Sequence, residues 1–373
     1  MQAARVRRPR PLLLAAALCA ASLGAAAQSN TKPPKAQLWM DVSTGTMAGM
    51  PEMDAGSSMA GMLGGLMGVK AGGGNANTTY GMARGMGIMP PRILDIALYN
   101  RIQPGTEAQQ VIPPGLRMGA SLPLVPPKAA TAERTPEGEV PDEYRQEKPK
   151  GRILIYWGCG AAVRAGQPRV IDFTKAQPAD YAAAFAGRYV PERGPRTNSS
   201  FALYPNEKNT VSLGRESSLM GEHQVQGEGI PASMKFTLGA AQDIMPSVDL
   251  RSTGTLQDSI QLGWKPVVNA RAYYLHALAQ NSDDLIIWSS AEAPDTGMGL
   301  FDYLPNATIE RWVKERVLLQ PEATQCAIPQ GVFAAGTAGV SGERATPMLR
   351  MVAYGGESNF AYPPRPPDPK APW

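Results

Sequence analysis

The chain has 373 residues and a formal net charge of +4, with 36 Lys and Arg against 32 Asp and Glu. Four positive residues, Arg5, Arg7, Arg8 and Arg10, precede the first acidic residue, Asp41. Without those four arginines the positive and negative residues balance. This argues against a nucleic-acid-binding protein, because a phosphate-binding surface needs a clustered basic excess.

The first 27 residues have the pattern of a secretory signal peptide. The arginines are followed by an apolar run from Leu12 to Leu23, and Ala25 to Ala27 supplies the small residues of a cleavage site. The apolar run is too short and too rich in Ala for a membrane span. We therefore expect an exported protein of the periplasm or exterior of a bacterium, with no transmembrane span in the mature chain.

Residues 28–90 form a Met-rich and Gly-rich low-complexity region that we expect to be disordered. Ten of the 18 methionines lie between Met40 and Met89, and few large side chains are present to offset the entropy of ordering. Several of these methionines repeat at a Met-x-x-Met spacing: Met47, Met50, Met53, Met59 and Met62. Thioether sulfur suits Cu(I), so periplasmic copper handling is an alternative function. Biased composition is the simpler explanation.

Residues 91–246 are predicted to form a β-rich domain, interrupted by an exposed, charged connector at 128–150. The polar stretch from Pro191 to Pro231 is predicted to be loops, and Ala179 to Ala186 a short helix. Apolar runs and alternating apolar positions predict strands at 93–99, 122–125, 153–157, 170–173 and 234–238.

Residues 247–362 carry the clearest strand pattern. One helix is predicted from Pro305 to Arg316, where apolar side chains form a single stripe. The tail, residues 363–373, holds six prolines and is predicted to be extended. Strands separated by turn signals, as in a β-sandwich, are predicted at 260–264, 272–279, 285–289 and 348–354. The fold class is therefore mainly β, with two β-rich domains.

The segment from Ser259 to Ala277 resembles two successive strands of fibronectin type III domains. That family has a W-x-x-V-x-x-A-x-x-Y arrangement, which is filled here by Trp264, Val267, Ala270 and Tyr273. The resemblance implies an Ig-like β-sandwich at 247–362, with binding or spacing as its work. The layout of the whole chain also resembles that of exported bacterial proteins of unassigned activity, which implies no particular reaction.

Only Cys159 and Cys326 follow the predicted signal peptide. Two cysteines allow one disulfide or two separate buried thiols, and an oxidising compartment favours the disulfide. As an alternative, Cys159 could be a nucleophile with His223 or His276 as its base. We expect a structural role for both histidines instead, His223 in a loop and His276 in a strand, because neither has a partner at metal-ligand spacing.

No familiar catalytic or cofactor motif is present. The sequence lacks G-x-S-x-G, H-E-x-x-H, a phosphate-binding G-x-x-x-x-G-K-[ST] loop and an EF-hand loop. Three tryptophans, Trp157, Trp264 and Trp288, are expected in the core. We therefore predict a non-enzymatic envelope protein without a cofactor, which binds or scaffolds an envelope protein or glycan. An unrecognised hydrolase remains the other alternative.

Overall fold

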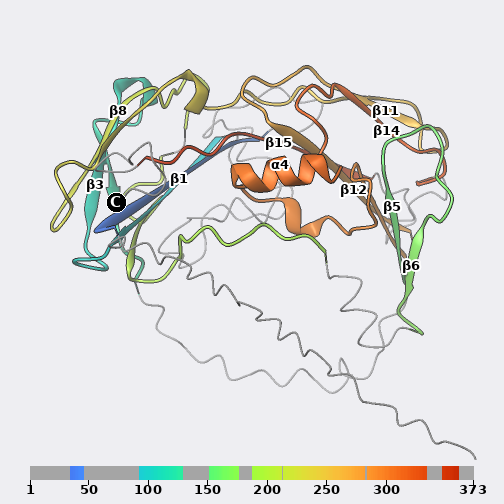
Figure 1. The fold of residues 1–373 in the computed structure, drawn as a ribbon, viewed down its shortest axis with the longest axis horizontal. Helices are drawn as coiled ribbons and strands as arrows, with labels where there is room; N and C mark the ends of the chain where they lie inside the picture. The colour runs from blue at the N-terminus through green and yellow to red at the C-terminus, as the bar shows by residue number, and fades with distance from the viewer. Residues whose placement is uncertain are drawn as a thin grey trace, which may run out of the picture. The chain divides into compact units, whose positions relative to one another are not determined.

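The computed structural model of the chain describes residues 34–45, 92–128, 151–175, 187–211, 213–281, 284–333 and 347–360 (Figure 1). All of them belong to one compact unit, Pro34–Pro363. The predicted signal peptide, nearly all of the connector, the short helix at 179–186 and the Pro-rich tail lie outside the described residues. So do the five methionines of the copper alternative.

The prediction of a mainly-β chain is confirmed, with 39% of residues in strands and 8% in helices. The inserted helix is also confirmed as α4 (Asn306–Lys314), the one α-helix in the described part of the chain. Within the described ranges, no helix is long and apolar enough to cross a membrane.

Two sheets enclose a first core. One is three-stranded, in the order β1 (Ala36–Thr44), β2 (Arg92–Asn100), β7 (Phe201–Tyr204). The other is four-stranded and antiparallel, and its strands in spatial order are β4 (Ser121–Leu124), β3 (Ala108–Val111), β8 (Gly221–Gly227) and β9 (Lys235–Leu238). Alternating side chains of these strands meet in one buried cluster that includes Leu94, Ile96, Leu98, Leu122, Leu124 and Val225.

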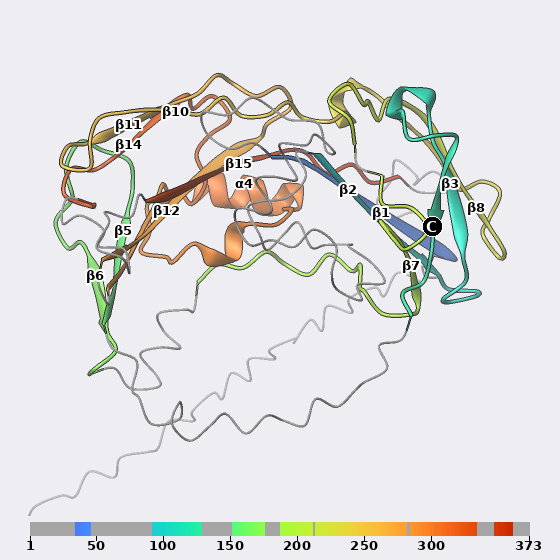
Figure 2. The ribbon, with the colours of Figure 1, turned by 180° about the vertical axis from the view of Figure 1, so that it is seen from behind.

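Two further sheets enclose a second core (Figure 2). The five-stranded sheet runs in the order β15 (Met348–Tyr354), β12 (Ala272–Asn281), β13 (Asp284–Ser289), β5 (Arg152–Trp157), β6 (Arg169–Asp172). The three-stranded sheet runs in the order β10 (Arg251–Thr253), β11 (Ile260–Gly263), β14 (Gln325–Ile328). The cluster between them contains Leu262, Trp264, Tyr273, Leu275, Ala277, Ile286, Trp288 and Ile328.

The five-stranded sheet crosses the predicted domain boundary at residue 246. Strand β5 precedes that boundary in the chain, yet it pairs in parallel with β13, with Leu285 opposite Ile153. A parallel pair needs a long crossover, and here more than a hundred residues separate the two strands. Strand pairing at such separation has no local signal in the sequence.

The outer face of the five-stranded sheet is covered by α4 and the turn before it (Figure 1). Ile309 and Trp312 of α4 pack with Leu300 against Tyr274 of β12 and Tyr354 of β15. Because successive strand residues point to opposite faces, this outer face is chemically distinct from the core. It holds the candidate site.

Two predictions about irregular segments are corrected in part, at residues 36–44 and at two strands between 191 and 231. Strand β1 lies inside the predicted low-complexity region, where all nine of its residues pair with β2. Strands β7 and β8 lie inside the stretch predicted to be loops. Strand β8 alternates buried His223 and Val225 with Gln and Glu, and this polar composition hides its period of two. Pairing with neighbours that are distant in the sequence outweighs weak local propensity.

Candidate functional site

The two cysteines that follow the predicted signal peptide are bonded to each other. Cys159 follows β5, Cys326 lies on β14, and their Cα atoms are 5.2 Å apart. Two backbone hydrogen bonds flank the bridge: Gly160 N–H donates to Ala327 O and Gln330 N–H to Ala161 O. The bond joins the two sheets around the second core. Neither sulfur is a thiolate, so the Cys159 nucleophile has no chemical basis in this structure.

His223 lies on a strand, not in the predicted loop, and its side chain is completely buried. Its Nε2 lies 2.8 Å from Leu219 O, and Gln110 Nε2 lies 3.0 Å from its Nδ1. Phe236 stacks on the ring at 5.1 Å. Burial lowers the pKa of His223. Both nitrogens of a neutral ring are therefore satisfied, with the proton on Nε2, and His223 acts as a structural residue.

His276 lies at the centre of the outer face of the five-stranded sheet. Its Nε2 lies 2.8 Å from Thr296 O, which places the proton on that nitrogen. In the sheet His276 pairs with Ser289 on one side and Arg350 on the other. Burial is the main cause that lowers its pKa to about 4. The ring is therefore neutral at pH 7.

Three buried polar atoms in this cluster, His276 Nδ1, Tyr274 Oη and Ser289 Oγ, have no hydrogen-bond partner within the described residues. Burial raises the pKa of Tyr274, and nearby Ser289 only partly opposes that rise. The backbone of Gly297 lies directly against this cluster. Gly297 has φ +70°, and a Cβ there would overlap the Tyr274 hydroxyl. The unpaired polar groups of the cluster are thus costly to bury.

Asp295 completes the polar cluster but does not form a catalytic triad. Its two oxygens accept the backbone N–H groups of Gly297 (2.8 Å) and Arg188 (2.9 Å), and the Arg188 guanidinium lies 3.5 Å away. His276 donates to a backbone carbonyl. Within the described residues, Ser289 forms a hydrogen bond with neither His276 nor Asp295. Acyl transfer needs a serine bonded to the imidazole and a carboxylate bonded to its other nitrogen. The arrangement does not meet that requirement.

Arg350 forms the exposed edge of this cluster. Its guanidinium lies 3.8 Å from the centroid of the Phe301 ring, and Phe301 contacts His276 edge-on at 5.2 Å. Partial burial lowers the pKa of Arg350. No acidic group lies within ion-pair distance of it in the described part of the chain. Among the residues that the structure describes, this stacked cation therefore has no counter-ion.

A shallow pocket of about 480 Å³ lies beside α4. Its wall includes Ile309 and Val313 of the helix, and an ion pair between Arg271 and Glu310 at 2.8 Å crosses its rim. Lys314, at the end of the helix, also lines it. A cation in the last turn of a helix is explained by the helix dipole, so this pocket needs no ligand to account for its charges.

The remaining predicted residues are structural or lie elsewhere. Trp264 and Trp288 are buried in the second core, and Trp157 is partly buried on the opposite face of the sheet. No group of three or more His, Cys, Asp or Glu residues within the described ranges could hold a metal ion.

Sequence reasoning did not single out Tyr274, Ser289 or Arg350. One signal was available for Arg350, which is the one charged residue in the strand sequence MLRMVAY. The other two were hidden because their positions alternate with core residues. Comparison with family models, with curated proteins and with solved structures finds no match to this chain. The site is therefore interpreted from its own geometry.

Proposed function

We propose that the mature chain is an exported bacterial envelope protein that works by binding or scaffolding and catalyses no reaction. One observation carries the proposal. Every His and Cys after the predicted signal peptide is engaged in holding the fold: two in a disulfide and two in buried, neutral imidazoles. These side chains are the usual nucleophiles and general bases at neutral pH.

The disulfide supports export. Bonds of this kind persist in oxidising compartments and are rare in the cytosol. Its partners are 167 residues apart in the chain, so it fastens the tertiary structure and not a local turn. This agrees with the signal-peptide pattern of the first 27 residues.

The packing of the second core supports a fibronectin type III-like sandwich. The Trp264 and Tyr273 rings meet edge-on at 5.5 Å, and Val267 N–H donates to Tyr273 Oη at 2.9 Å. Thus three residues of the W-x-x-V-x-x-A-x-x-Y pattern are in direct contact. Strands β11 and β12, which the segment with this pattern connects, belong to opposite sheets around one core, as expected for a sandwich. Binding is a common use of such sandwiches, although fold does not fix function.

The proposal is tested by export and capture. Epitope-tagged full-length protein is expressed in its native cell, the envelope is fractionated, and cross-linked partners are identified by mass spectrometry. We expect mature protein, processed after about residue 27, in the envelope fraction with both cysteines oxidised and a reproducible partner. Reduced, unprocessed protein in the cytosol would contradict export. If the tagged protein recovers no partner beyond those recovered with an unrelated exported sandwich protein, the result would contradict binding.

A further inference from the structure

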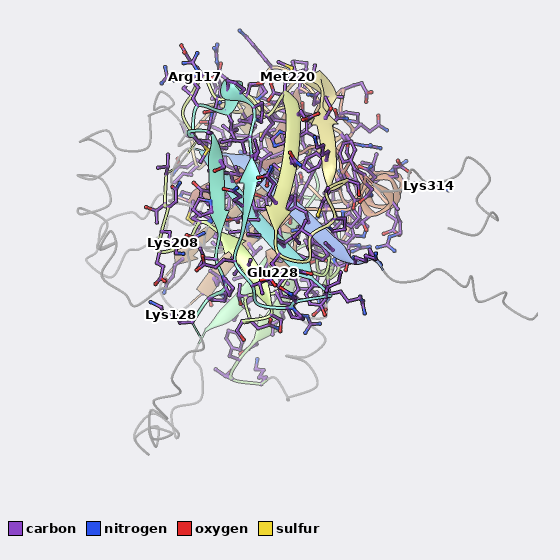
Figure 3. All side chains as sticks on the ribbon, turned by 90° about the vertical axis from the view of Figure 1, so that its left-hand side faces the viewer. Arg117, Lys128, Lys208, Met220, Glu228 and Lys314 are labelled. Carbon is purple, nitrogen blue, oxygen red and sulfur yellow. A yellow bond between two sulfur atoms is a disulfide. The ribbon has the colours of Figure 1, made fainter. Side chains whose placement is uncertain are left out.

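Many charged side chains on the described surface form ion pairs. On the side of the first core that faces the viewer in Figure 3, the labelled cations Arg117, Lys128 and Lys208 each pair with a glutamate at 2.6 to 2.7 Å. The charge of each of these cations is already neutralised by a glutamate, so such exposed pairs are poor anchors for a partner.

Arg350 differs from these residues in both its partners and its burial. It is half-buried and stacked on Phe301, which fixes its orientation. The carboxylate of the cluster, Asp295, is already bound by two backbone N–H groups and Arg188. His276, on the adjacent strand, is neutral. A stacked guanidinium keeps its in-plane N–H donors available for a bidentate carboxylate.

Exposed apolar side chains lie on the two elements that hold this cation, β15 and the turn of Phe301. Met348, two residues earlier on the same face of β15, is 54% exposed. Met298, in the turn that carries Phe301, is 48% exposed. Met, aromatic residues and Arg are the types enriched in protein interfaces, whereas a mobile lysine is depleted there. We call Arg350, Phe301, Met298 and Met348 the Arg350 patch.

The Arg350 patch lies on an edge strand. Within the described residues β15 pairs with β12 alone and ends the five-stranded sheet. Its seven residues include a single charge and no proline. An edge of this kind presents unpaired backbone groups to which an extended segment can add as a further strand.

We propose that the β15 edge and the Arg350 patch bind an extended segment of a partner protein that places a carboxylate on Arg350 and apolar side chains on the two methionines. The inference rests on the proposed binding function and specifies its site and ligand class. A second copy of this chain is a poorer occupant, because antiparallel pairing of β15 with itself supplies a second Arg350 and no carboxylate. Charge complementarity therefore favours an acidic partner.

The test uses two hexapeptides in extended, capped form: acetyl-VTETVT-amide, in which Glu and the two Val side chains share one face, and a matched peptide with Lys in place of Glu. Binding to the full mature protein is followed by the shifts of backbone amide resonances. We expect saturable binding of the Glu peptide, shifts centred on β15 and the 297–301 turn, and at least about tenfold weaker binding of the Lys peptide.

The Arg350→Gln variant should bind both peptides equally. Arg251→Gln is the matched control, because Arg251 lies on another sheet edge and pairs with Asp249 at 2.8 Å. It should keep the discrimination, and unfolding midpoints should show that both variants are folded. No saturable binding at millimolar Glu peptide, discrimination that survives Arg350→Gln, or a β15-mediated dimer would each overturn the inference. If envelope capture persists in Arg350→Gln, the binding function stands and this site is wrong.

Discussion

The bond between Cys159 and Cys326 closes a very long loop, and its removal should cause a large loss of stability. We consider the double variant Cys159→Ala/Cys326→Ala. The two cysteines are 167 residues apart, and loop-closure entropy for this length corresponds to about 5 kcal/mol at 25 °C. This effect acts in the unfolded chain. The native backbone bonds around the bridge, such as Gly160 N–H to Ala327 O, therefore do not compensate for it.

The assay is urea unfolding of the oxidised protein and the double variant, followed by tryptophan fluorescence and far-UV circular dichroism. The free energy of unfolding should fall by about 5 kcal/mol. The dependence on urea should become steeper, because the unfolded chain without the cross-link exposes more surface. Wild-type protein reduced with a phosphine should behave like the variant. A difference below about 1 kcal/mol, with thiol labelling showing no free cysteine in the wild type, would refute the entropic reasoning.

Three other predictions concern buried polar contacts. Gly297→Ala should destabilise the protein by roughly 2–4 kcal/mol through overlap and a positive φ, whereas Gly119→Ala, which has a positive φ but open space, should cost about 1 kcal/mol; similar losses would contradict the packing argument. Arg193→Gln should cost about 3–5 kcal/mol, because it removes the guanidinium that binds the buried carboxylate of Asp41 at 2.6 and 2.7 Å. Adding Asp41→Asn should recover part of this loss, and a recovery of zero would show that the two residues are not coupled. Between pH 6.5 and about 4 the unfolded chain binds a proton at His276 that the folded chain does not bind. Acidification through this window should therefore lower the free energy of unfolding of the wild type by up to about 3 kcal/mol relative to His276→Gln. Parallel pH profiles of the two unfolding free energies would contradict this.

Much of the β-structure was predictable because its signals are local. Strand β12 is predicted from 272 to 279 because this segment is apolar apart from His276 and follows a turn signal, and α4 is predicted from its apolar stripe. Strand β1 was missed because its neighbours in sequence are Met and Gly, although Leu38, Met40 and Val42 all pack toward the first core. Its stability comes from β2, about fifty residues later.

The candidate site was less accessible to sequence reasoning. His276 was correctly placed in a strand, but its surroundings come from three strands, the 295–301 turn and residue 188. Ser289 and Arg350 become neighbours of His276 only through strand register. No spacing rule in a single sequence reports which face of a sheet a distant turn will cover.

The central claim is that the histidines of this chain support the fold and that its function is binding. The most direct test is the titration of His223 and His276 by nitrogen-15 NMR of the two imidazole rings in the mature protein. We predict that both neutral rings carry the proton on Nε2, that the pKa of His223 is below the ordinary value of a histidine, and that His276 does not titrate until the pH approaches about 4. A histidine that titrates near pH 7 and exchanges rapidly with solvent would contradict the claim, because it would be available as a general base.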